Sequence, residues 1–116
     1  MGRLESLKKS NQFKKALKEK KIHTDYFSIF AAKNFFLPKH KANLLISFVM
    51  KKKIGNAVKR NKIRRKLKAI VQKLLKKKGA INNNYTYIVF GKSNAYAQKQ
   101  DVLLPLMEKS FSKLKK

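Results

Sequence analysis

The sequence contains no cysteine, and no long apolar run is present. Without cysteine, disulfide bonds and thiolate metal sites are excluded, and a reducing cytoplasm is the expected location. No segment approaches the ~18–20 consecutive apolar residues that a membrane-spanning helix needs. The first residues lack the apolar core of a signal peptide, and Gly2 with Ser6 fits only the short N-myristoylation pattern. We therefore expect no membrane partner.

Acidic residues are scarce as well, and they are scattered along the chain. They are Glu5, Glu19, Asp25, Asp101 and Glu108. A two-metal nuclease needs several carboxylates that converge on ions about 3.5–4 Å apart. His23 and His40 are lone residues in expected loops, and no Ser/His/Asp set or Gly-rich phosphate loop is present. The sequence therefore argues against an active site carried by this chain itself.

Positive charge dominates what is present. Lys and Arg total 31 against 5 Asp and Glu, which gives a formal net charge of +26. A compact chain with this charge repels itself unless a polyanion neutralises it. Each Lys or Arg that meets a phosphate releases counterions, so we expect tight, salt-dependent binding to nucleic acid. With 116 residues, 43% of them hydrophobic, and no linker or repeat, we expect one domain over residues 1–116 with flexible basic ends.

Hydrophobic spacing predicts an α+β fold, a two-layer sandwich with the order α-β-β-α-β-α. The expected elements are a short helix from Ser10 to about Lys20, strands over 26–32, 44–50 and 85–90, a long helix from Ala57 to Lys77 or Lys78, and a last helix that starts between Asp101 and Leu104. Asn56 is the expected N-cap of the long helix and Gly79 its stop. Pro105 is expected in the first turn of the last helix, where proline is tolerated.

The long helix combines the clearest periodicity with the rarer type of positive charge. Its apolar stripe is Ile63, Leu67, Ile70, Val71, Leu74 and Leu75. The chain has four arginines against 27 lysines, and three of the four, Arg60, Arg64 and Arg65, lie within six residues. The guanidinium group can grip a phosphate with two hydrogen bonds and stack on bases. We therefore expect this helix to make directed contacts with a polyanion, with Arg60 placed over the edge of the sheet.

The run from Lys52 to Arg65, KKIGNAVKRNKIRR, resembles the signature of the bacterial ribonuclease P protein. In that family a Lys-Lys-(Val/Ile)-Gly-Asn-Ala-Val run leads into an Arg-Asn-Arg helix. Lys62 stands where the family usually has arginine, so it keeps the charge but loses the planar fork. Weaker similarity covers most of the chain, at Leu7–Lys9, Phe13, Tyr87–Phe90 and Phe111.

The resemblance implies an unusual left-handed βαβ crossover, against the general right-handed rule. It also implies a subunit of an endoribonuclease holoenzyme that removes the 5′ leader of precursor tRNA. The catalytic RNA would do the chemistry with Mg²⁺ bound mainly by that RNA, and no protein partner is expected. The implied RNA-binding residues are Lys52, Lys53, Asn56, Arg60, Asn61, Lys62, Arg64, Arg65 and Lys68. The implied leader cleft contains Phe13, Leu17, Ser28 and Phe30, with Leu17 at a position that is often aromatic in the family.

Other functions fit the sequence less well. A ribosomal or other structural RNA-binding protein would explain the charge but not the Gly55–Val58 lead into the Arg-Asn helix. A DNA-binding module could place the long helix in a major groove. However, a strand precedes that helix, where a helix-turn-helix motif would have another helix.

Overall fold

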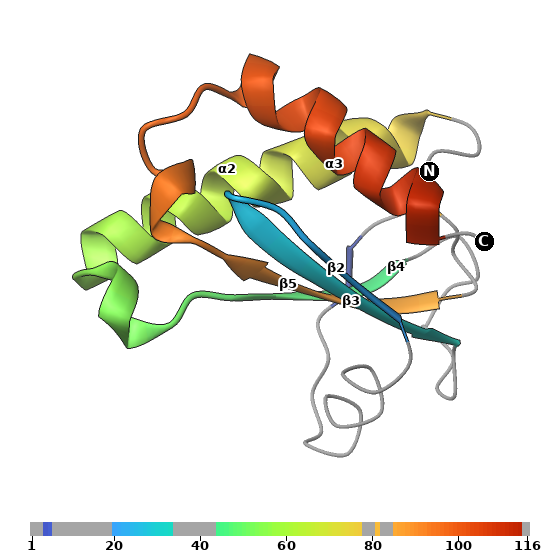
Figure 1. Cartoon of the computed structure of the whole chain (residues 1–116), viewed down its shortest axis with the longest axis horizontal. Helices are drawn as coiled ribbons and strands as arrows, with labels where there is room; N and C mark the ends of the chain where they lie inside the picture. The colour runs from blue at the N-terminus through green and yellow to red at the C-terminus, as the bar shows by residue number, and fades with distance from the viewer. Residues whose placement is uncertain (1–3, 6–19, 34–43, 78–80, 82–84, 115–116) are drawn as a thin grey trace.

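The structure is a computed structural model that describes residues 4–5, 20–33, 44–77, 81 and 85–114. Its centre is a five-stranded sheet in the order β1-β4-β5-β3-β2, and the two described helices lie together on one face of that sheet (Figure 1). The strands are β1 (Leu4–Glu5), β2 (Lys20–His23), β3 (Phe27–Lys33), β4 (Leu44–Val49) and β5 (Tyr85–Gly91). The helices are α2 (Ala57–Lys76) and α3 (Gln100–Leu114), and the 3₁₀ turns are η1 (Lys52–Ile54) and η2 (Ser93–Ala95). The predicted two-layer α+β architecture is confirmed.

The sheet has two strands that the sequence did not predict. β2 pairs antiparallel with β3, from Lys20 opposite Ala31 to His23 opposite Ser28. His23 is therefore the last residue of a strand, and the prediction that it lies in a loop was wrong. β1 pairs parallel with β4. The predicted helix from Ser10, the Gly79 stop and His40 lie outside the described residues.

The connection from β4 through α2 to β5 joins two parallel neighbouring strands. In Figure 1, β4 runs leftward at the back, α2 returns rightward above the sheet, and β5 runs leftward nearer the viewer. This path has the left-handed sense that the family resemblance implied, and it departs from the right-handed rule for such units. As a result, the start of α2 lies beside the ends of β4 and β5.

The core fills the space between the sheet and its two helices. Alternation along β3 places Phe27, Ile29 and Ala31 in this layer, each with no exposed surface, as the sequence predicted. The apolar stripe of α2 lies opposite them, although Leu75 is only partly buried. Tyr87 of β5 packs edge-to-face on Phe111 of α3, with ring centroids 5.0 Å apart. Burial of this layer fixes the position of α2 on the sheet.

The two helix starts are set by local chemistry. Asn56 caps α2 as predicted, because its Oδ1 accepts a hydrogen bond from the Lys59 backbone N–H at 3.0 Å. α3 begins at Gln100, one residue before the expected window. Pro105 therefore lies in the second turn, and the prediction of the first turn was wrong. Its missing N–H leaves the Asp101 carbonyl without that helix partner, but both residues are exposed, so water can serve that carbonyl.

Candidate nucleic-acid interface

The stretch from the η1 turn through Asn56 to Lys68 of α2 contains all the RNA-binding residues expected from the sequence. Most of their side chains are exposed: Lys52, Lys53, Asn56, Asn61, Lys62, Arg65 and Lys68. Arg60 and Arg64 are half-buried. The Arg64 guanidinium donates a hydrogen bond from Nη1 to Asn61 Oδ1 at 3.0 Å, which aligns the two side chains on the helix surface. The turn and the helix therefore both present exposed cationic side chains, and this set of residues is the cationic surface of η1 and α2.

Arg60 differs from the other arginines of α2. Its Nε is buried and has no hydrogen-bond partner in the described part of the chain. A buried donor of this kind is costly when it stays unpaired, especially on a charged group. An incoming phosphate oxygen that reached this guanidinium would offset that cost.

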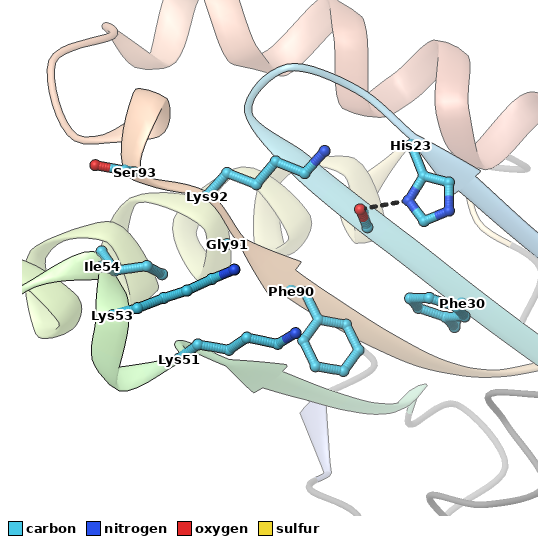
Figure 2. A pocket seen from close by; sticks show the side chains of 10 residues that line it. His23, Phe30, Lys51, Lys53, Ile54, Phe90, Gly91, Lys92 and Ser93 are labelled. Carbon is cyan, nitrogen blue, oxygen red and sulfur yellow. Dashed lines mark hydrogen bonds between the residues drawn. The ribbon is translucent and has the colours of Figure 1, made fainter.

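A cavity of about 530 Å³ lies on the face of the sheet opposite α2 and α3, where β3, β5 and η1 meet (Figure 2). We call it the sheet-face cleft. Its lining residues are His23, Ser28, Phe30, Lys51, Lys53, Ile54, Phe90, Gly91, Lys92 and Ser93. Two of the expected leader-cleft residues, Ser28 and Phe30, are thus in one cavity. The other two, Phe13 and Leu17, lie outside the described residues.

Aromatic rings form a row in the sheet-face cleft. The rings of His23 and Phe30 are edge-to-face at 5.7 Å, and those of Phe30 and Phe90 at 5.4 Å. His23 Nδ1 and Ser28 Oγ are 2.6 Å apart, and this hydrogen bond orients the imidazole. Lys51 Nζ lies 5.7 Å from the centre of the Phe90 ring, and Figure 2 shows Lys51 extending to that ring while Lys53 extends toward β5 near Gly91. Rings bordered by ammonium groups suit unstacked bases and their phosphates.

Sequence reasoning missed the contribution of His23, Lys51, Phe90 and Lys92 to this cleft. The predicted strand over 85–90 contained Phe90, but only the register that pairs Phe90 with Ser28 shows that it adjoins Phe30. The position of His23 could be predicted only with β2, whose sequence carries no alternating apolar signal. Lys92 is fixed by a hydrogen bond from its ammonium to the Thr24 carbonyl at 2.6 Å, a contact between distant parts of the chain.

The interface has little negative charge to neutralise it. Within the described residues one ion pair forms, between Lys77 and Glu108 at 2.8 Å, at the other end of α2. No group of three or more His, Cys, Asp or Glu side chains in that part of the chain could hold a metal ion. Burial, and secondarily the positive charge of Lys62, lowers the pKa of Lys66 from its ordinary value. Like charges are therefore crowded on α2.

Fold and site together define a small basic α+β protein whose exposed surface is suited to a polyanion. The sequence matches the family model for ribonuclease P over residues 1–115. It is 31% identical over 117 residues to the ribonuclease P protein component of Acholeplasma laidlawii (strain PG-8A), covering 98% of this chain and 89% of that protein. The chain belongs to the ribonuclease P protein family.

Solved structures show the same fold. The Staphylococcus aureus RNase P protein aligns with a TM-score of 0.73 at 22% identity, covering 95% of this chain and 94% of that one. The RNase P protein from Thermotoga maritima aligns with a TM-score of 0.65 at 23% identity and the same coverage. Family membership implies a component of the ribonuclease P enzyme that associates with its RNA. In the part of the chain that the structure describes, neither helix is long and apolar enough to cross a membrane.

Proposed function

We propose that this chain binds the catalytic RNA of ribonuclease P through η1 and α2 and binds the 5′ leader of precursor tRNA in the sheet-face cleft. One observation carries the proposal. Lys53 belongs to the cationic surface of η1 and α2, and it also lines the cleft. A leader in the cleft would therefore lie directly beside the bound catalytic RNA. The protein would align the two RNAs for endonucleolytic 5′ maturation of tRNA in the cytoplasm.

The cleft supplies the chemistry that a single-stranded leader needs. Phe30 and Phe90 offer faces and edges on which unstacked bases of any sequence can pack. Lys51, Lys53 and Lys92 line the same cleft and would neutralise the leader phosphates. The leader would thus be held with little demand on its sequence.

Bond cleavage itself is assigned to the RNA subunit in this proposal. Mg²⁺ would be bound mainly by that RNA, whose phosphates are suitable hard oxygen ligands. The acidic residues of the protein are dispersed, and the described ones form no group that fits a metal ion. The protein would contribute by positioning the substrate and by screening the repulsion between two polyanions.

The test is cleavage of precursor tRNA at low Mg²⁺ with purified protein alone, with the ribonuclease P RNA of its own source alone, and with both. We expect efficient leader removal only from the mixture. Phe30→Ala should weaken binding of precursor tRNA that carries a leader, while binding of mature tRNA stays unchanged. If the wild-type protein adds nothing to the RNA, the proposal fails. Ribosomal or another structural RNA would then be the partner to examine.

A further inference from the structure

A second pocket lies beside the η2 turn and shares Ser93 with the sheet-face cleft. The segment after β5, drawn in orange in Figure 1, lies against the first half of α2. The Lys66 ammonium holds this segment by donating three hydrogen bonds. Their acceptors are the carbonyl oxygens of Ala95 at 3.0 Å, Tyr96 at 2.8 Å and Gln98 at 2.5 Å. The Lys59 ammonium adds a hydrogen bond to Ser93 Oγ at 3.0 Å. These bonds give the segment a defined position on the cationic helix.

Tyr96 presents its ring to solvent at this point. The residue is 37% exposed, one of the few large hydrophobic residues exposed in the described part of the chain. Two ammonium groups lie over the ring, with Lys62 Nζ at 5.0 Å and Lys59 Nζ at 5.3 Å from its centre. Cation–π contacts at exposed positions are weak. The lysines can therefore turn from the ring toward a phosphate at little cost.

The space beside Tyr96 is large enough for a nucleotide. It measures about 450 Å³, within the usual range for small-ligand sites. Its lining residues are Asp25, Tyr26, Lys59, Ser93, Asn94, Tyr96, Ala97 and Gln98. Asn94 Nδ2 donates to the Asp25 carbonyl at 3.2 Å, which ties the two walls together. The Asp25 carboxylate and the Gln98 amide can pair with the polar edge of a base or with a ribose hydroxyl.

We propose that Tyr96, Lys59 and Lys62 form a second RNA site that takes one unpaired nucleotide of the catalytic RNA. The base stacks on the Tyr96 ring, and its phosphate lies between the two lysines. This inference rests on the proposed function, since it concerns the same RNA. Lys62 is on the helix surface assigned to that RNA, whereas the proposed leader cleft is on the face of the sheet opposite α2 and α3. The two sites share Ser93 in their linings.

Tyr96→Trp gives a direct test, because the chain has no tryptophan of its own. Stacking with a base quenches indole fluorescence. Ser112→Trp, on the exposed surface of the last turn of α3, is the matched control reporter. Each protein is titrated with the ribonuclease P RNA of its own source and, separately, with precursor tRNA. We expect strong quenching of Tyr96→Trp by the ribonuclease P RNA and little change in Ser112→Trp.

Several results would overturn the inference. One is unchanged Tyr96→Trp fluorescence while the ribonuclease P RNA binds. Another is quenching by precursor tRNA but not by the ribonuclease P RNA. A third comes from affinity measurements at fixed salt. Tyr96→Ala should raise the Kd for the ribonuclease P RNA about tenfold, whereas Tyr96→Phe should keep it. Equal Kd values for Tyr96→Ala and wild type, with folding checked by circular dichroism, would contradict the stacking role.

The failure of the proposed function gives a different result. In that case the wild-type protein itself would neither bind the ribonuclease P RNA nor promote leader removal, and both proposals would fall. If wild-type binding and cleavage are normal but the Tyr96 variants behave as wild type, only the second site is wrong.

Discussion

At the scale of single residues, the three arginines of α2 have different surroundings and should contribute differently. Arg65 is exposed, Arg64 donates a hydrogen bond to Asn61, and the buried Nε of Arg60 has no hydrogen-bond partner among the described residues. Arg65→Ala should weaken binding to the ribonuclease P RNA at every salt concentration. It should also reduce the slope of log K against log salt by about 1, the value of one lost phosphate contact. Lys109→Ala, exposed on α3, is the control. An unchanged slope for Arg65→Ala would contradict a direct phosphate contact.

The backbone conformation at position 55 requires a glycine. Its φ of 153° with ψ of −162° lies in a region that is essentially restricted to glycine. A Cβ there would also lie 2.9 Å from Lys59 Cδ. Gly55→Ala should therefore lower the free energy of unfolding by about 1–3 kcal/mol, as measured by thermal or urea denaturation. The exposed Lys53→Ala should change stability by less than about 0.5 kcal/mol. Equal stability of the two variants would show that the junction tolerates a side chain.

At the scale of elements, Asn56 caps α2 as the sequence predicted, and its contact with RNA stays a prediction. Asn56→Ala should cost about 1 kcal/mol of stability, because the Lys59 N–H loses its acceptor. Asn56→Ser keeps a capping oxygen and should restore stability. If Asn56 acts through the cap, both stability and RNA affinity recover in the serine variant. Recovery of stability without recovery of affinity would instead indicate a direct RNA contact.

The elements also show how far sequence reasoning extends. The start of α2 followed from its apolar stripe and capping residue, which are local signals. Lys20–His23 gave no such signal, because β2 is a strand through its pairing with β3 and contains a single apolar residue. The same limit applies to the sites. The arginines of α2 stood out by their scarcity among lysines, whereas Phe90 and Tyr96 gain their surroundings from strand register and from the η2 turn.

At the scale of the whole molecule, the net charge of +26 predicts opposite effects of salt on folding and on binding. Added NaCl screens repulsion between the lysines, so the Tm of the free protein should rise between about 0.02 and 0.5 M. Over the same range the affinity for RNA should fall steeply, because the counterions released on binding enter a more concentrated salt solution and gain less entropy. Differential scanning calorimetry and filter binding measure the two trends. A Tm that falls with NaCl would show that self-repulsion does not limit stability.

The Ser93 position, shared by the sheet-face cleft and the Tyr96 pocket, has a geometric consequence. Phe90 borders one cavity, Tyr96 borders the other, and the chain between them is pinned to α2 by Lys59 and Lys66. A segment of fixed length that is held on α2 keeps the distance between the two cavities constant. It would therefore fix the spacing between an RNA bound in one cavity and an RNA bound in the other. With the leader and the catalytic RNA bound as proposed above, lengthening this segment by one residue should shift the site of cleavage and leave the affinity of each cavity for its RNA nearly unchanged.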